Sequence, residues 1–196
     1  MVVDNKNIWA YHPPTPNVGL RYQEILDIAS SNNLSIWVDA KNINTSDNCN
    51  TLFTSMISLN LVKNKVLIEF PPSTDPSDEK ILDCVKKFVG LGFATSYYVP
   101  SDLSENCSKH LKEINPDTAV ENQDCQSIER KLNAVIESGA FTDLSFSYHG
   151  IETMNSMKFS KVLNWNTWHI EANNLSELEK NKYRMVITNN KDPNNL

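Results

Sequence analysis

The stretch Leu34-Ser-Ile-Trp-Val-Asp-Ala-Lys-Asn42 decides the fold, because an apolar strand passes directly into an acid, Asp39, and a base, Lys41. Residues two apart in a strand point to the same side, so both side chains are expected at the carboxyl end of one strand. Parallel α/β folds gather their ligands at that end. A carboxylate and an ammonium there could hold a metal ion and an anionic oxygen; the plainer interpretation is a structural ion pair at the sheet rim.

Length, composition and charge are those of one ordinary globular domain. The chain has 196 residues, of which 40% are hydrophobic and 21% charged, enough for a single sizeable core. A formal charge of -6 without any Lys/Arg cluster argues against nucleic acid as a partner. No run approaches the ~18 apolar residues of a membrane span, and the first residues lack the blocks of a secretory signal. The sequence does not identify the compartment; a longer form of the protein could belong to the cell envelope or be secreted.

The cysteines and the asparagine motifs give no firm signal. The four cysteines include no CxxC pair, so neither a zinc site nor a redox motif is predicted. Two disulfides would be possible in an exported protein, but buried or incidental thiols are the expected state. Four tripeptides match the N-glycosylation pattern, at Asn33, Asn44, Asn106 and Asn174. An Asn-rich sequence produces such matches by chance.

Strand and helix patterns alternate along the chain. Apolar runs bounded by turn residues predict strands, and apolar residues at helical spacing predict helices. The strands are expected at 7–12, 34–39, 65–70, 93–99, 142–149, 162–168 and 184–188. The helices are expected at 20–29, 49–61, 78–89, 103–114, 127–137 and 176–180. This alternation favours parallel βαβ units.

The strand count indicates a barrel that is incomplete at its N-terminus. A (β/α)8 TIM-type barrel takes ~250 residues, so the chain is short by about one and a half β/α units. The shortage is at the front, because the sequence begins almost on a strand and ends in a polar tail, 189–196. The expected fold is therefore an α/β barrel lacking its first strands, in one partial domain over 1–196. Its open edge would favour self-association.

Polar and aromatic side chains are expected around the mouth formed by the strands' carboxyl ends. The candidates are His12, Asp39, Lys41, Glu69, Tyr97, Tyr98, His149, Trp165 and Trp168. His12 suits a general acid or base because imidazole titrates near neutral pH. Asp39 and Glu69 suit a divalent cation, since Mg²⁺ and Ca²⁺ prefer carboxylate oxygens, and the aromatics suit a pocket floor. Alternatively, Glu69 points out of the core into solvent, His149 belongs to a turn, and the aromatic residues pack in the core.

The chain resembles the glycerophosphodiester phosphodiesterases in two regions. In the first region, His12-Pro-Pro, Gly19-Leu and Trp37-Val-Asp39-Ala-Lys41-Asn42 resemble a segment of the family. In that segment the second catalytic His ends one strand, and an acid-x-Lys motif ends the next. The other is the late Trp-containing strand and the final strand with its Thr-Asp-x-Pro turn, resembled by Leu163-Asn-Trp165-Asn-Thr-Trp168 and Met185-Val-Ile-Thr188-Asn-Asn-Lys-Asp-Pro193. The motifs His-Pro-Pro and Asp-x-Lys are also similar to menorin-type proteins of the same superfamily.

The resemblance implies a phosphodiesterase barrel related to phosphatidylinositol-specific phospholipase C. It implies that His12 protonates the leaving alcohol, that Asp39 helps bind Mg²⁺ or Ca²⁺, and that Lys41 contacts the phosphate of a small phosphodiester or phospholipid-derived substrate. The family's His-Arg-Gly motif and its Glu-x-Asp ligands have no counterpart before Ile8, and Asp39 replaces the usual Glu. The chain is therefore expected to be part of a longer enzyme, the alternative being a reduced member without catalysis.

Two other classes of function stay open. A non-catalytic binding or surface protein would keep the barrel and its aromatic mouth but not the chemistry. An unrelated enzyme acting on sugars would use Asp39 and Glu69 as a carboxylate pair, which needs the two groups ~5–9.5 Å apart. Side chains on opposite faces would exclude the sugar enzyme, and a His12 directed away from Asp39 and Lys41 would count against the phosphodiesterase.

Overall fold

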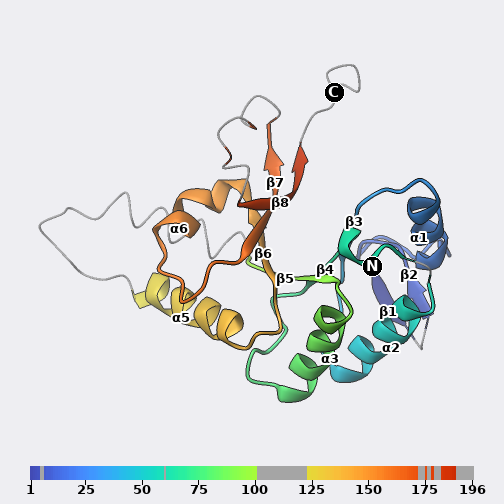
Figure 1. Cartoon of the computed structure of the whole chain (residues 1–196), viewed down its shortest axis with the longest axis horizontal. Helices are drawn as coiled ribbons and strands as arrows, with labels where there is room; N and C mark the ends of the chain where they lie inside the picture. The colour runs from blue at the N-terminus through green and yellow to red at the C-terminus, as the bar shows by residue number, and fades with distance from the viewer. Residues whose placement is uncertain are drawn as a thin grey trace, which may run out of the picture. The chain divides into compact units, whose positions relative to one another are not determined.

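The computed structural model describes residues 1–4, 7–59, 61–100, 123–171, 175, 178 and 182–188. Its parallel sheet has the strand order of the sequence, β3-β4-β5-β6-β7-β8 (Figure 1). These strands are β3 (Ile36–Asp39), β4 (Val66–Phe70), β5 (Ala94–Tyr98), β6 (Asp143–Ser147), β7 (Asn164–Ile170) and β8 (Tyr183–Thr188). The predicted α/β class is confirmed, because sequential strand order with helical connections is the pattern of βαβ units.

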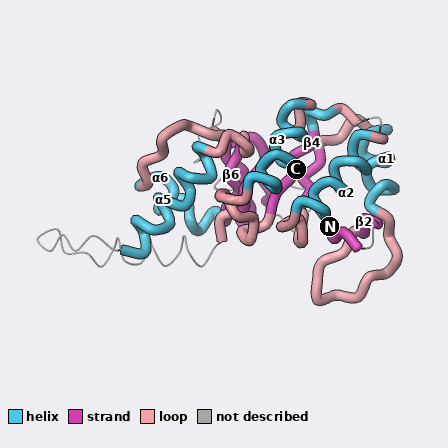
Figure 2. The backbone as a smooth tube through the Cα atoms, turned by 90° about the horizontal axis from the view of Figure 1, so that it is seen from below, coloured by secondary structure: helices cyan, strands magenta, loops and turns pink. Residues whose placement is uncertain are grey.

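The helices fall mainly where apolar residues recur at helical spacing. Figure 2 draws the helices in cyan. They are α1 (Tyr22–Ser31), α2 (Ser46–Ile57), α3 (Glu79–Gly90), α5 (Gln123–Glu137) and α6 (Ile151–Ser156). Two short 3-10 helices are η1 (Lys63–Lys65) and η2 (Tyr148–Gly150). The predicted helix 103–114, nearly all of 176–180 and the tail 189–196 lie outside the described residues. None of the helices described is long and apolar enough to cross a membrane.

Side-chain caps set two of the helix boundaries. The Thr45 hydroxyl accepts a hydrogen bond from the Asn48 backbone N–H, so α2 begins three residues before the start expected from apolar spacing. The Asp78 carboxylate accepts from the N–H groups of Lys80 and Ile81 at the start of α3, as predicted. Such caps satisfy backbone donors that the first helical turn leaves unpaired. α3 ends at Gly90, one residue beyond the expected end, and Gly92 after it takes the left-handed conformation with φ of 90°.

The chain divides into two compact units, of which the first comprises Met1–Tyr97 and Ser138–Thr142. Its core is an aromatic cluster on one face of β4. Phe70 meets Phe88 of α3 and Phe141 edge to face, with ring centroids 6.2 and 5.9 Å apart, and Phe88 also contacts Phe53 of α2. Because side chains alternate along a strand, Phe70 defines the helix-covered face of β4, and Glu69 lies on the opposite face.

The first strands of the chain form a separate antiparallel pair. β1 (Val2–Asp4) pairs with β2 (Asn7–Trp9), with Val2 opposite Trp9. The prediction of a parallel barrel strand at 7–12 is therefore wrong, since a preceding short strand offers β2 a local partner. The Asn42 side chain fastens this pair to the segment after β3, because its amide binds both the N–H and the carbonyl of Val3 at 2.9 and 2.7 Å.

A disulfide joins α2 to α3 in unit 1. Cys49 of α2 and Cys84 of α3 are bonded, and both are buried, on helices that lie side by side (Figures 1 and 2). Cys125 is disulfide-bonded as well. The expectation of unpaired thiols is thus wrong, because the pairing brings together residues 35 positions apart in sequence, and sequence spacing alone does not reveal such a contact.

We expect the double substitution Cys49→Ala/Cys84→Ala to lower the free energy of unfolding by about 4 kcal/mol. That is the chain-entropy effect of opening a loop of this length in the unfolded state. Urea denaturation followed by circular dichroism measures it. A matched control is Thr45→Ala, which removes the α2 cap and should remove only about 1 kcal/mol. A smaller loss in the cysteine variant than in the cap variant would contradict the prediction.

The hydroxyl of Tyr22 on α1 is buried, and it has no hydrogen-bond partner among the described residues. Burial raises the pKa of Tyr22 above its ordinary value, since the phenolate would be desolvated. Below the unfolded pKa of about 10 both states keep the proton, so the shift has no effect there. As pH rises above that value the unfolded chain ionises while the native one resists, and native stability falls.

We therefore predict that Tyr22→Phe leaves stability at pH 7 unchanged or raises it by about 1 kcal/mol, because an unsatisfied polar group is removed. The variant should also lose less stability than the wild type between pH 9 and pH 11. The matched control is Tyr97→Phe, since the Tyr97 hydroxyl donates to the Pro72 carbonyl at 2.9 Å and its loss should destabilise. Denaturation curves in which both variants behave alike would contradict this reasoning.

Unit 2 comprises Tyr98–Glu137 and Asp143–Leu196, described over the ranges given above. In it β6, β7 and β8 pair in parallel, and Leu144 aligns with Trp165 while Ser145 aligns with Asn166. One strand face is apolar and packs on Ile136 of α5 and Met154 of α6 around a cavity of about 200 Å³. The other face is polar although it is buried.

Candidate functional site

In unit 1, three polar side chains form a row across the strands. Asp39 of β3 is the register partner of Glu69 of β4, which is in turn the partner of Ser96 of β5. Neighbouring strands lie about 4.8 Å apart and aligned residues project to the same face. The row therefore lies opposite Phe70 and the helices, at the carboxyl end of β3 and β4. This register sets Asp39 and Glu69 side by side on one face of the sheet.

Lys41 completes this group from the turn after β3. Its ammonium lies 2.6 Å from the Asp39 carboxylate, and the two side chains are 32% and 42% exposed. Glu69 is only 4% exposed. The unit thus holds one carboxylate open to solvent and one buried beside it, with a lysine that can reach an anion. A lysine ammonium offers three donors and no acceptor, so Lys41 suits carboxylate or phosphate oxygens.

The amino-terminal ammonium lies against the same turn. It donates to the Asp39 carbonyl at 2.7 Å, and the Lys41 N–H donates to the Met1 carbonyl at 2.9 Å. Burial lowers the pKa of this amine; the Asp39 charge raises it and the Lys41 charge lowers it further. The backbone bonds of Met1, which precedes β1, therefore fix the position of the segment that carries Asp39 and Lys41.

His12 lies apart from this row in the described contacts. It is exposed in a turn after β2, where its carbonyl accepts from the Thr15 N–H at 2.9 Å. Among the described residues no hydrogen bond or ion pair joins its side chain to Asp39 or Lys41. Because β2 is antiparallel to β1, His12 does not end a parallel strand, which was the premise for placing it at the mouth.

Tyr97 belongs to the packed core of unit 1. It is the register partner of Phe70 and so lies on the helix-covered face. Its ring meets Phe141 edge to face with centroids 5.6 Å apart, and its hydroxyl donates to the Pro72 carbonyl. A role for Tyr97 in binding substrate has no support in these contacts.

In unit 2, an aromatic and histidine cluster gathers at strand ends. Tyr98 at the end of β5 stacks on Trp168 of β7, with ring centroids 5.3 Å apart and planes 12° from parallel. His169 follows with φ of 62°, at a register shift between β7 and β8, and its ring centroid lies 6.2 Å from that of His149. Bulges and left-handed non-glycine residues often re-aim side chains near functional sites. Tyr98, Trp168 and His149 were candidate site residues, whereas we expected His169 to be a surface residue or a neighbour of the site.

Trp165 does not join that cluster. It lies in register with Leu144, meets Phe146 edge to face at 5.0 Å and lines the cavity beside α5 and α6. The Lys182 ammonium lies 3.4 Å from the centre of its ring, a cation–π contact. The odd spacing between Trp165 and Trp168 signals opposite strand faces, so the sequence itself could have separated the two tryptophans.

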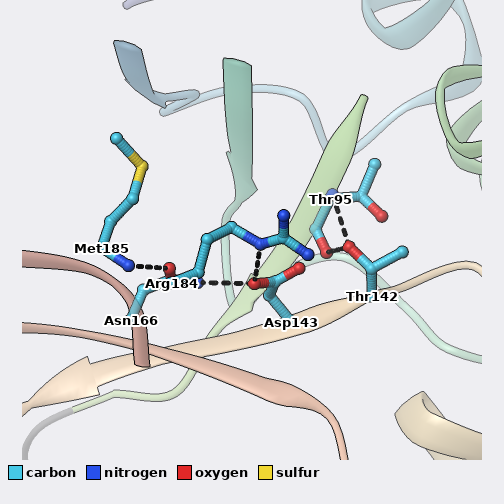
Figure 3. A network of polar contacts seen from close by, with 6 residues as sticks. All are labelled: Thr95, Thr142, Asp143, Asn166, Arg184 and Met185. Atoms are coloured by element: carbon cyan, nitrogen blue, oxygen red, sulfur yellow. Dashed lines mark hydrogen bonds and ion pairs between the residues drawn. The ribbon is translucent and has the colours of Figure 1, made fainter. Parts of the chain in front are cut away.

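A buried carboxylate that sequence reasoning missed lies at the start of β6. The Asp143 carboxylate is fully buried and accepts from Arg184 Nε at 2.7 Å and from Asn166 Nδ2 at 3.4 Å (Figure 3). The Asn166 amide oxygen accepts from the Met185 N–H at 3.1 Å, so the group spans β6, β7 and β8. Figure 3 also shows a contact within unit 1, where the Thr95 N–H donates to the Thr142 hydroxyl at 3.0 Å and that hydroxyl donates to the Thr95 carbonyl at 3.2 Å. Position at the amino end of a strand favours a structural role.

We predict that Arg184→Met lowers the free energy of unfolding of the chain by about 3 kcal/mol, because it leaves the Asp143 charge buried without its cation. Removing both charges with Arg184→Met/Asp143→Asn should be milder than the sum of the single changes, with a coupling above ~1 kcal/mol. Urea denaturation of the four proteins of the cycle measures this. Lys161→Met, which removes an exposed cation of the same unit, serves as control. Additive effects would show that the ion pair contributes nothing.

Comparisons with protein-family models, with curated proteins and with solved structures found no match to this chain. Within the described ranges, no group of three or more His, Cys, Asp or Glu side chains is placed to hold a metal ion. The candidate site is therefore defined by its own residues: the row Asp39–Glu69–Ser96 with Lys41 in unit 1.

Proposed function

We propose that the chain carries part of a phosphodiesterase site of the glycerophosphodiester type, in which a divalent cation and Lys41 act on a phosphodiester. The observation that carries the proposal is the register that sets Asp39 beside Glu69, with the Lys41 ammonium 2.6 Å from Asp39. Two carboxylates for a cation and one ammonium for a phosphate oxygen are the elements that such a reaction needs. The resemblance of Trp37-Val-Asp39-Ala-Lys41 to the family's acid-x-Lys motif supports the same assignment.

The donor set fits magnesium better than calcium. Mg²⁺ is commonly held by one or two carboxylates, with water and substrate phosphate oxygens as the remaining ligands, whereas Ca²⁺ takes six to eight oxygens. Asp39 and Glu69 would supply the two carboxylates. When bound, the cation would neutralise phosphate charge and lower the pKa of a bound water or alcohol.

The chain's own residues would divide the remaining tasks. Lys41 is paired with Asp39, so engagement of the Asp39 oxygens by a cation would free the ammonium for a phosphate oxygen. Burial of Glu69 next to this pair keeps part of the site away from water, which strengthens charge interactions there. His12 as the general acid remains a prediction, because its exposed turn is joined to neither Asp39 nor Lys41 by a described contact.

A non-catalytic binding protein is the second candidate. The observation in its favour is the same ion pair: a carboxylate already satisfied by Lys41, with no described histidine bonded to it. In this case the row would bind an anion or stabilise the turn without turnover.

We predict that the chain binds Mg²⁺ and that Asp39→Ala weakens binding at least tenfold in a calorimetric titration. Glu69→Gln should weaken it too. Lys41→Met should leave cation binding equal or tighter, because a competing positive charge is gone, while it lowers hydrolysis of bis(4-nitrophenyl) phosphate measured on the same samples. Asp83→Asn, which alters an exposed carboxylate of α3 in the same unit, is the matched control.

Two results would decide against the phosphodiesterase. Wild-type protein that is folded by circular dichroism but takes up no Mg²⁺ would favour the binding protein. Equal binding by the wild type and Asp39→Ala would place any cation elsewhere, leaving Asp39 and Lys41 as a structural pair.

A further inference from the structure

The disulfide of unit 1 indicates the kind of compartment in which this fold forms. Cys49 and Cys84 are 0% and 1% exposed, and their bond connects α2 to α3. Structural disulfides form and persist in oxidising compartments, such as the secretory pathway, and are rare in reducing ones. A buried bond between core helices is therefore a mark of passage through such a compartment, where asparagine side chains are also glycosylated.

The tripeptide Asn33-Leu34-Ser35 has the sequence that N-glycosylation requires. It forms the loop between α1 and β3, and all three residues are exposed, Leu34 to 56%. Asn33 takes the left-handed conformation with φ of 57°, which asparagine tolerates better than most residues. The loop thus presents its asparagine at the surface without any part of the tripeptide entering the core.

The contacts of Asn33 leave its amide nitrogen available. Lys65 Nζ donates to the Asn33 Oδ1 at 2.8 Å and to its backbone carbonyl at 3.0 Å. A lysine ammonium only donates, so the oxygen of the amide must face it, and Nδ2 is the other terminal atom. Among the described residues Nδ2 makes no hydrogen bond. Glycosylation replaces one hydrogen on Nδ2 and keeps Oδ1, so the Lys65 contact is compatible with a glycan.

We infer that Asn33 is an N-glycosylation site of this protein. The donor is an oligosaccharide linked through its C1 carbon to a lipid diphosphate. A bond forms between Nδ2 and C1, and the C1–oxygen bond to the diphosphate breaks. The lipid diphosphate leaves with that electron pair, Nδ2 loses one proton to a base, and nothing is oxidised or reduced.

The second sequon within the described residues is placed less favourably. Asn44-Thr45-Ser46 runs into α2, where the Thr45 hydroxyl caps the first turn and Ser46 is the first helical residue. A glycan there would sit against the start of a helix that carries Cys49. In the loop at Asn33, no residue of the tripeptide caps a helix or belongs to one. We therefore assign Asn33 as the site.

The test directs the whole chain into the secretory lumen of a eukaryotic cell with a heterologous leader and analyses the Asn33 peptide by mass spectrometry before and after peptide-N-glycosidase. We expect a glycan on Asn33 that the enzyme releases, leaving Asp in its place. Ser35→Ala should abolish it while the acceptor stays intact, and Ser35→Thr should retain it. Asn32→Gln, which changes the exposed neighbour outside the tripeptide, should retain it as well.

The Cys49–Cys84 bond is read from the same sample by non-reducing digestion, which shows that the chain folded in the oxidising lumen. An unmodified Asn33 in protein that carries this bond would overturn the assignment. A secreted chain with both cysteines reduced would overturn the compartment on which it depends.

Discussion

The register between β3, β4 and β5 is the constraint on which unit 1 depends. In β4, Glu69 projects to one face and Phe70 to the other, and the register aligns Glu69 with Asp39 of β3 and Phe70 with Tyr97 of β5. A slip of one residue would reverse every side chain of the shifted strand. In β4 that would drive the Glu69 carboxylate into the ring cluster around Phe88. Glu69 is buried in either register, so the slip would cost the exchange of polar neighbours for aromatic rings; this favours the observed register, which in turn sets the candidate site.

Unit 2 follows the same rule with a different distribution of charge. Leu144 and Trp165 lie on the face that packs on α5 and α6, while the opposite face holds Asn166 and the Asp143–Arg184 pair. A buried carboxylate is tolerable here because a guanidinium and an amide both donate to it. The pair lies at the amino end of β6, whereas the Tyr98–Trp168 stack lies at strand carboxyl ends. The buried ion pair and the aromatic stack are thus separated along the strands, at the two ends where parallel α/β folds carry stabilising and ligand-binding residues respectively.

The parallel strand order was predictable from the alternation of strand and helix patterns. The position of Asp39 and Lys41 at a strand end was predictable because both directly follow an apolar run of strand length. The faces of Tyr97 and Trp165 were predictable too: Tyr98 and Trp168 belong to the opposite parity, and only one member of each pair can face a site. Other features needed three dimensions. Nothing in the sequence pairs Cys49 with Cys84 or Asp143 with Arg184, which are 35 and 41 positions apart. The β1–β2 pair was missed because strands of three residues carry almost no periodicity.

Disulfide and candidate site are joined through the start of α2. The Asn42 side chain holds β1, and the Asn42 backbone carbonyl accepts a hydrogen bond from the Asn48 side chain at 2.8 Å. Asn48 precedes Cys49, whose bond to α3 keeps α2 in place against the core. The turn that carries Lys41 is therefore held from one side by β1 and from the other by an oxidised helix pair. Reduction of that bond would loosen the anchor of the turn before it touched the strands, because the Asp39–Glu69 pairing is made by backbone hydrogen bonds of the sheet.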